Sequence, residues 1–243
     1  MTTPPETMTV SARPRRPQTW PLTATLIATS LGFGVIQLDV TVVNVAVKQI
    51  GASFGGGITG LQWVVSAYTL VLAALILTAG ALGDRFGAKR MLCTGFVVFT
   101  AASVLCGLST SMAMLIAARA LQGLGAAFLG SCALALLNHS YTDPRQRTRA
   151  VGRFVAGASA ALSGGPVIGG FLIAAFGWRA IFFINVPLGA AGCWLALRYA
   201  SETERSAHRR VDTRGAALAT IALAGFAAVV IAPGPTASPA RGC

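Results

Sequence analysis

The stretch GALGDRFGAKRML, residues 80–92, sets four charged side chains between two long apolar runs. These charges fall within the seven residues from Asp84 to Arg90, and Gly87 interrupts them. Glycine permits a tight turn of the backbone. The stretch therefore predicts two apolar helices that reverse direction through a short polar joint, and the composition of the whole chain indicates what surrounds them.

Composition favours a membrane protein. The chain has 243 residues, of which 54% are hydrophobic and only 11% are charged, whereas a soluble domain carries about 25% charged residues. About 20 apolar residues cross a bilayer core as a helix. The sequence predicts an all-α polytopic membrane protein, a six-helix bundle followed by a partial seventh helix. The expected spans are residues 20–47, 62–82, 91–109, 112–141, 151–176 and 180–197, with a shorter seventh at 215–232.

These spans define the expected organisation of the chain. It comprises a disordered cytoplasmic tail (1–19), a six-helix domain (20–197), a cytoplasmic basic loop (198–214), the partial seventh helix (215–232) and a tail (233–243). The first run is longer than the roughly 7–15 apolar residues of a signal peptide and contains Asp39, which disfavours cleavage. The final PGPTASPARGC cannot continue a helix, and we expect a truncated product on that ground.

The basic residues alternate from joint to joint. The chain carries 19 Lys and Arg against 7 Asp and Glu, a net charge of +12, which raises nucleic-acid binding as an alternative. Fifteen of these basic residues lie in the amino-terminal segment and in or beside the joints after spans two, four and six; the other joints hold only Lys48 and Arg179. Cytoplasmic loops carry this excess. We therefore expect a multi-pass protein of the cell membrane with a cytoplasmic amino terminus and no nucleic-acid partner.

No pattern for metal binding or catalysis stands out. Four of the five cysteines lie in apolar spans, and none forms a CxxC pair or a Cys/His metal spacing. The glycine-rich GLGAAFLG, residues 123–130, follows no strand and lies inside an apolar span, so it does not indicate a dinucleotide site. We expect no metal, no cofactor and no enzyme activity.

The quoted stretch resembles the signature loop of the major facilitator superfamily, roughly G-x-L-a-D-r-x-G-r-k-x-x-l. Ala88 replaces the first of its paired basic residues. The resemblance implies a cytoplasmic gate that latches two halves of a transporter. Gly83 and Gly87 let the backbone turn and pack closely, and Asp84 can interact with a helix N-terminus. The expected gate residues are Gly80, Gly83, Asp84, Arg85, Gly87, Lys89 and Arg90.

Further strings resemble the fourteen-helix branch of the drug:proton antiporters in that superfamily. They are LDVTVVNVAV (38–47), RALQGLGAA (119–127) and GWRAIFFINVPLG (177–189). The fifth span resembles the antiporter motif G-x8-G-x3-G-P-x2-G-G, with Ala161 in place of its second glycine. That motif implies a hinge in which Pro166 kinks the helix and small residues allow close helix contacts. The hinge residues are Gly152, Gly165, Pro166, Gly169 and Gly170.

The resemblance implies proton-coupled efflux of drugs or other amphipathic small molecules. The partners would be such a substrate, protons and the lipid bilayer. The family has about twice this length, so we also expect a missing carboxy-terminal half or self-association. The alternatives are an inactive fragment and a membrane partner protein that transports nothing.

Asp39 and Arg119 are the candidates for proton coupling. A charge at membrane depth is costly and marks a functional site by default. With the outer boundary at Val47 for the first span and at Met112 for the fourth, both residues lie roughly 10–12 Å below it, so the two side chains could meet. A change of conformation that moves Arg119 would then switch Asp39 between holding and releasing a proton. A purely structural ion pair is the alternative.

Supporting polar residues lie on the same two spans. Gln122 and Gly123 follow Arg119 by three and four residues, on the same helix face. Gln37, Thr41 and Asn44 form a stripe on the first span that suits either a water-facing cavity or hydrogen bonds between helices. We expect the polar face of this half, formed by Gln37, Asp39, Asn44, Arg119 and Gln122, to turn outward, and Tyr68 is open to contact with a lipophilic substrate.

Overall fold

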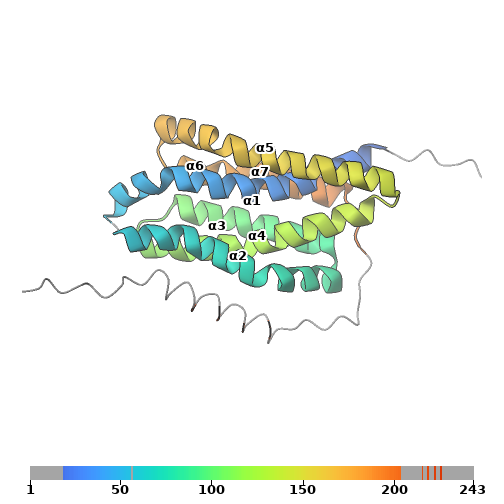
Figure 1. The fold of residues 1–243 in the computed structure, drawn as a ribbon, viewed down its shortest axis with the longest axis horizontal. Helices are drawn as coiled ribbons and strands as arrows, with labels where there is room; N and C mark the ends of the chain where they lie inside the picture. Colours follow the sequence, from blue (N-terminus) through green and yellow to red (C-terminus); the bar gives the residue numbers. More distant parts are fainter. Residues whose placement is uncertain are drawn as a thin grey trace, which may run out of the picture.

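The computed structural model describes residues 19–55 and 57–203, and beyond them only the single positions Gly215, Leu218, Ala222 and Gly225. Within residues 19–203 it consists of α-helices without strands (Figure 1). Their bounds are α1 Thr19–Phe54, α2 Ile58–Phe86, α3 Ala88–Gly107, α4 Met112–Ser140, α5 Pro144–Phe176, α6 Ala180–Phe183 and α7 Asn185–Tyr199.

The six predicted spans within the six-helix domain are confirmed. Six helical segments in the described part of the chain are long and apolar enough to cross a membrane, with α6 and α7 together forming the sixth, Ala180–Tyr199. The terminal tails lie almost entirely outside the described residues, as do most of the predicted basic loop and seventh span. Two boundaries differ clearly from the expected ones: α1 continues to Phe54 rather than ending at residue 47, and α5 begins at Pro144 rather than at residue 151.

These differences have physical causes. Beyond residue 47 the helix α1 carries the exposed Lys48 and Gln49, which lower its hydropathy without breaking the helix. At the start of α5, the Asp143 side chain accepts a hydrogen bond from the backbone N–H of Gln146 at 2.9 Å, and Pro144 occupies the first turn. Both residues favour a helix start. The basic residues that follow are therefore helical rather than part of a loop.

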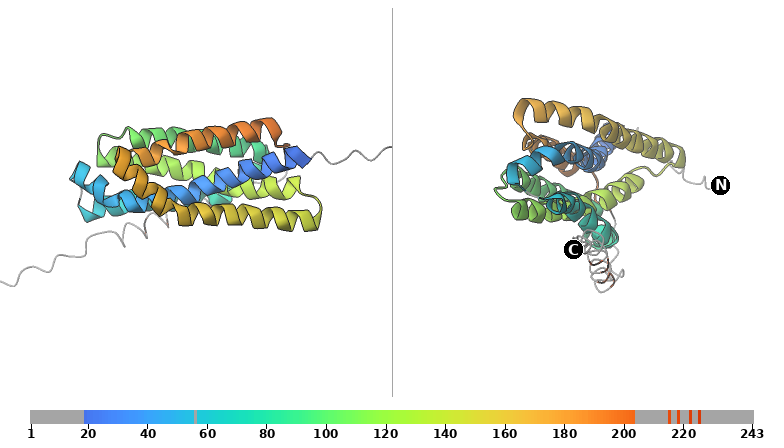
Figure 2. Two further views of the ribbon diagram at one scale, coloured as in Figure 1. Left: turned by 90° about the horizontal axis from the view of Figure 1, so that it is seen from above. Right: turned by 60° about the vertical axis from the view of Figure 1, so that its left-hand side comes forward.

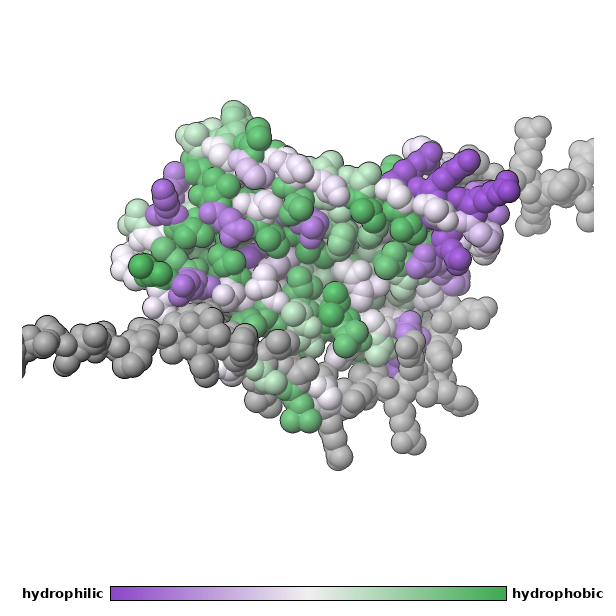
Figure 3. All heavy atoms as spheres, in the orientation of Figure 1, coloured by the Kyte–Doolittle hydropathy of each residue, from purple (hydrophilic) through white to green (hydrophobic). Residues whose placement is uncertain are grey.

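The helices form two groups of three. α1 packs against α5 and α7, whereas α4 packs against α2 and α3. Contacts of α1 with α4 and of α3 with α7 join the groups into one elongated bundle of nearly parallel helices (Figures 1 and 2). Hydrophilic side chains gather at the end of the bundle where α4 connects to α5, while much of the visible side is hydrophobic (Figure 3). This is the distribution expected of a membrane-embedded bundle.

Two glycines bring α2 and α3 close to α4. A Cβ atom on Gly123 would lie 2.5 Å from the carbonyl oxygen of Tyr68 on α2. A Cβ on Gly125 would lie 2.6 Å from the backbone nitrogen of Phe99 on α3. Small residues allow such backbone approach in membrane bundles. Gly123 therefore allows α4 to pack closely against α2, one turn away from Arg119.

The joint between α2 and α3 is shorter than the sequence suggested. We expected a connection over residues 83–90, but α2 continues to Phe86 and α3 begins at Ala88, so Gly87 alone links them. Its φ of +104° is a conformation that glycine tolerates. Gly83 makes no turn: it lies inside α2, where a Cβ would be 2.9 Å from the Cys132 sulfur. The turn therefore depends on one glycine rather than two.

The segment after α7 caps this joint. Glu202 Oε1 accepts a hydrogen bond from the backbone N–H of Lys89 at 2.9 Å, and Thr203 Oγ1 accepts one from the N–H of Ala88 at 2.8 Å. The first N–H groups of a helix lack partners within the helix, and a carboxylate there is favourable. Glu202 also lies 3.6 Å from Arg90. The sequence pattern of this segment does not predict the cap.

We predict that Gly87→Ala destabilises the protein by about 1–3 kcal/mol, the cost of a strained backbone conformation. The added Cβ would also lie 2.5 Å from the Glu202 carboxylate. Gly57→Ala is the matched control, because Gly57 has a φ of −60° and open space around it. The free energy of unfolding in mixed detergent and SDS micelles measures both. Equal stability of the two variants would contradict the prediction.

Candidate functional site

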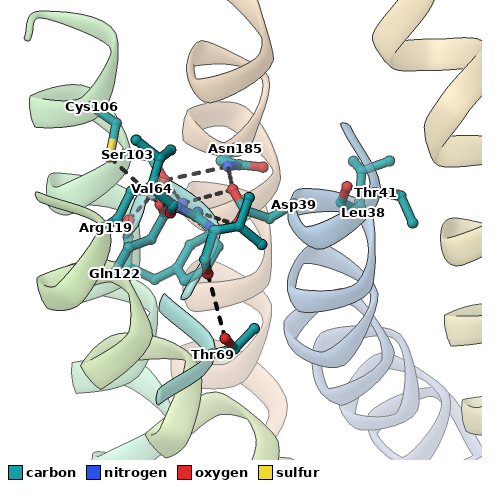
Figure 4. A network of polar contacts seen from close by, with 12 residues as sticks. Leu38, Asp39, Thr41, Val64, Thr69, Ser103, Cys106, Arg119, Gln122 and Asn185 are labelled. Carbon is teal, nitrogen blue, oxygen red and sulfur yellow. Dashed lines mark hydrogen bonds and ion pairs between the residues drawn. The ribbon is translucent and has the colours of Figure 1, made fainter. Parts of the chain in front are cut away.

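Asp39 and Arg119 form a buried ion pair. Arg119 on α4 donates from Nη1 to Asp39 Oδ2 on α1 at 2.5 Å, and the two residues are 1% and 0% exposed. The structure thus brings together the two charged residues that the sequence singled out (Figure 4). An unpaired charge at this depth would carry a large desolvation penalty, so each group compensates the other.

Gln122 connects the two members of the pair. Its Oε1 accepts from Arg119 Nη1 at 2.7 Å, and its Nε2 donates to Asp39 Oδ1 at 2.8 Å. Arg119 Nε also donates to the carbonyl oxygen of Val64 on α2, at 3.2 Å. Gln122 is fully buried. One turn of α4 therefore supplies both the cation and the amide that orients it against the carboxylate.

Two further residues, which the sequence did not single out, belong to this network, and one of them, Asn185, bonds the carboxylate. Asn185, at the start of α7, donates from Nδ2 to Asp39 Oδ1 at 3.1 Å and to Ser103 Oγ at 3.3 Å. Ser103 on α3 also accepts from Gln122 Nε2 at 2.8 Å. Both are completely buried. A lone asparagine within an apolar span indicates a hydrogen bond between helices. Its partner could not be predicted, because it depends on the packing of α7 against α1.

Tyr68 lies beneath the pair. The Cζ of Arg119 is 4.2 Å from the centre of the Tyr68 ring, within the range of a cation–π contact. The side chain is 0% exposed. The sequence leaves open that Tyr68 meets a lipophilic substrate; in this arrangement it instead covers the guanidinium from the α2 side. α2 thus contributes an aromatic ring and a backbone carbonyl to the site.

The expectation that the polar face turns outward is wrong for its central members. Asp39, Arg119 and Gln122 are buried among α1, α3, α4 and α7. Only Asn44 is exposed, and Gln37 is partly buried. That expectation rests on the absence of an opposite half, which would leave the polar inner face of this half turned toward lipid. Asn185 and Ser103 give these groups partners inside the bundle, so no opposite domain is needed to satisfy them.

The contact between Asp39 and Arg119 agrees with the equal depth expected of them. The helix end used in that argument differs: α1 continues to Phe54, so Asp39 lies fifteen residues before its end, whereas Arg119 lies seven residues after the start of α4. The number of residues to a helix end is therefore a poor measure of depth.

Thr41 lies at the contact between α1 and α5. Its hydroxyl donates within the helix to the carbonyl oxygens of Gln37 and Leu38, at 3.1 and 2.9 Å. A Cβ on Gly165 of α5 would overlap the Thr41 Oγ1 atom. Thr41 therefore packs between helices, and within the predicted stripe Asn44 remains the exposed member.

The residues of the predicted hinge fall into two groups. Gly165 and Gly169 are buried where α5 crosses α1, and a Cβ on Gly169 would lie 3.2 Å from Val42. Gly152 and Gly170 have nothing within 4 Å of a Cβ, and Pro166 is exposed. Figure 2 shows α5 changing direction in its carboxy-terminal half, the half that contains Pro166. The residues of α5 that contact α1 and the bend of α5 thus lie in the same half of this helix.

The predicted gate residues surround Gly87. Lys89 Nζ donates to the carbonyl oxygen of Leu197 at 2.9 Å, and Arg85 is exposed with its guanidinium over the Phe86 ring. Gly80 is in ordinary contact with Ser131 of α4. Asp84 is partly buried near the end of α2. Lys89 therefore contacts both α7 and Glu202, and Arg90 contacts Glu202, within the same six-helix body.

The family model of the Major Facilitator Superfamily matches residues 29–237. The multidrug resistance protein Stp of Mycobacterium tuberculosis (strain CDC 1551 / Oshkosh) is 42% identical over 85% of this chain and 38% of its own length. The methylenomycin A resistance protein of Bacillus subtilis (strain 168) is 44% identical over 87% of this chain and 45% of its own.

A solved structure has the same fold. The crystal structure of the peptide transporter POT (E310Q mutant) in complex with sulfate matches with a TM-score of 0.64 and 16% identity, over 88% of this chain and 45% of that chain. A further relative, the cephamycin export protein CmcT of Amycolatopsis lactamdurans, is 39% identical over 83% of this chain and 42% of its own length. The chain spans less than half the length of these proteins.

Proposed function

The chain belongs to the major facilitator superfamily, and from that premise we propose that its six spans form the amino-terminal, proton-coupling domain of an exporter of drugs or other amphipathic small molecules. The observation that carries the proposal is the Asp39–Arg119 pair, a titratable carboxyl group and a cation buried inside a bundle of apolar helices. The printed names of three relatives, which describe resistance or export, support the substrate class.

Coupling follows from the compensation of charge. In the arrangement described, the Asp39 carboxylate accepts hydrogen bonds from Arg119, Gln122 and Asn185. A movement of α4 relative to α1 that withdraws Arg119 leaves the carboxylate uncompensated, and an uncompensated carboxylate in apolar surroundings binds a proton rather than stay charged. Return of Arg119 favours release of that proton. Protonation of Asp39 thus shifts the balance between two positions of α4 relative to α1, as coupling requires.

The hinge and the gate would set those two states. The contact of Gly165 with Thr41 brings α5 against the same helix that holds Asp39. Bending of α5 at Pro166 therefore acts on α1 directly. At the other joint, Glu202 and Thr203 fasten α3 to the segment after α7, which keeps α3 and α7 moving as one body. Rocking of packed helices around a fixed site is the usual form of alternating access.

A chimaera tests the proposal. The matched part of the Bacillus methylenomycin A resistance protein, aligned over 212 residues, is replaced by the corresponding residues of this chain. We expect this chimaera to confer resistance through efflux that collapses with a protonophore, and the 243-residue chain by itself to confer none, because substrate sites in this class lie between repeats. A chimaera that is present in normal amounts and confers no resistance contradicts the proposal, as does resistance conferred by the chain alone.

We further propose that the α2–α3 joint faces the cytoplasm, and predict its labelling accordingly. Arg85→Cys in a cysteine-free background should resist impermeant thiol reagents in intact cells and react after permeabilisation. Arg85 is exposed, whereas Ala88 is 2% exposed and would report burial instead. Ser111→Cys, exposed between α3 and α4 at the other end, should react in intact cells. The reverse pattern would overturn the orientation.

A further inference from the structure

The hydrogen bonds that neighbouring side chains make to Asp39 all come from donors. Oδ2 accepts from Arg119, while Oδ1 accepts from Gln122 at 2.8 Å and from Asn185 at 3.1 Å. A protonated carboxyl group differs because its O–H is a donor that needs an acceptor. Buried donors without an acceptor are costly. If Asp39 takes up a proton, as the proposed function requires, one of its neighbours has to provide an acceptor.

Few of the side chains that bond Asp39 and Gln122 have an acceptor to offer a protonated Asp39. Arg119 has no acceptor atom. Gln122 Oε1 already accepts from Arg119 at 2.7 Å and from the Cys106 thiol at 3.6 Å, and its Nε2 donates to both Asp39 and Ser103. Turning this amide would therefore break several bonds at once. The Ser103 hydroxyl donates to the carbonyl oxygen of Phe99 at 2.9 Å and accepts from two amides.

Asn185 differs from Gln122 in having an unused oxygen. Its Oδ1 is buried and has no hydrogen-bond partner among residues 19–55 and 57–203. Figure 4 shows the amide nitrogen directed toward Asp39 and Ser103, with the oxygen directed away from both. Buried carbonyl groups are normally paired. A turn of this amide about its last side-chain bond gives up the Nδ2 bonds to Asp39 and Ser103 but breaks no bond at Oδ1, and it presents that oxygen to Asp39.

We infer that Asn185 is a positioning residue which hydrogen-bonds Asp39 in both protonation states by turning its side-chain amide. Nδ2 donates to the carboxylate, and after the turn Oδ1 accepts from the carboxylic acid. The proton that arrives on Asp39 is the one that Oδ1 receives as a hydrogen bond, so no further group is needed to balance the step. This inference rests on the proposed function, because it assumes that Asp39 titrates.

The local sequence suits this role. Asn185 is the first residue of α7, and Ile184 alone separates it from the short helix α6. Pro187 falls in the first turn of α7, where a missing backbone N–H costs nothing. The other titratable or charged groups around Asp39 in the described chain are Arg119 of α4, Tyr68 of α2 and Cys106 of α3. α7 contributes the neutral amide.

Infrared difference spectra of the 243-residue chain, recorded in lipid nanodiscs while the pH is changed, test the inference. The band of protonated Asp39 is assigned by its loss in Asp39→Asn. We expect Asn185→Leu to raise the frequency of that band, because the acid loses its acceptor. Asn138→Leu, at an exposed position, is the matched control and should leave the band in place. Helical circular dichroism establishes that each variant is folded.

A second measurement needs no substitution at Asn185. The chain has three asparagines, Asn44, Asn138 and Asn185. With side-chain 13C labelling, we expect an asparagine carbonyl band that shifts together with Asp39 protonation and persists in Asn138→Leu. If the Asp39 band keeps its frequency in Asn185→Leu and no asparagine band shifts, the role of Asn185 is overturned, whereas proton uptake by Asp39 is not. The absence of any Asp39 band in the unsubstituted chain overturns proton uptake by Asp39, and the inference with it.

Discussion

Replacing Asp39 by asparagine in the chimaera is expected to reduce methylenomycin A resistance to that of cells without the pump. Asn keeps the size of the side chain and can still accept a hydrogen bond from Arg119, so the bundle should remain folded. It cannot take up a proton, which removes the step that couples export to the proton gradient. Drug efflux from preloaded cells, with and without a protonophore, measures the loss.

Asp143→Asn is the matched control for this prediction. Asp143 lies outside the spans and caps α5, and asparagine is an equally good cap. We expect this variant to retain resistance at the level of the unsubstituted chimaera. Normal protonophore-sensitive efflux by the Asp39→Asn protein, present in equal amounts, would exclude Asp39 as an essential proton carrier and leave the pair with a structural role.

Removal of Arg119 alone should be the most destabilising change at the site. Arg119→Leu leaves the Asp39 carboxylate buried without a compensating cation, and breaking a buried pair in this way costs about 3–5 kcal/mol. The double variant Asp39→Asn, Arg119→Leu should recover most of that loss, because no uncompensated charge remains. Unfolding in mixed detergent and SDS micelles gives the free energies for the double-mutant cycle.

Arg145→Leu provides the reference for this cycle. Arg145 is exposed in the first turn of α5, and exposed substitutions usually change stability by less than about 0.5 kcal/mol. If Arg119→Leu costs no more than Arg145→Leu, the pair is not the buried, mutually compensated unit described above. A double variant as unstable as Arg119→Leu would instead indicate that the packing of the guanidinium, and not its charge, stabilises the bundle.

The sequence was informative where a physical cost is local. A charge within an apolar span is expensive wherever the chain folds, which is why Asp39 and Arg119 could be selected before any contact was known. The six spans follow from the same reasoning, since each needs about 20 apolar residues. Gly87 was also identified correctly as a turn residue, and its φ of +104° gives the reason.

The remaining features depend on how the helices pack. Asn185 lies 146 residues from Asp39 along the chain, and only the approach of α7 to α1 makes the two neighbours. The pattern of polar residues along one helix does not show which other helices cover them. The burial of the ion pair could not be predicted for that reason, because it depends on α3 and α7. Glu202 was counted in a basic loop, yet it caps α3. These contacts arise between elements and have no local pattern.

Proton release on substrate binding is the most direct test of the account. Purified chimaera in a weakly buffered detergent solution is mixed with methylenomycin A while a pH-sensitive dye reports free protons. The account predicts release from the unsubstituted protein and from Asp143→Asn, and none from Asp39→Asn. Equal proton release by the Asp39→Asn protein would contradict the claim that Asp39, buried against Arg119, carries the coupled proton.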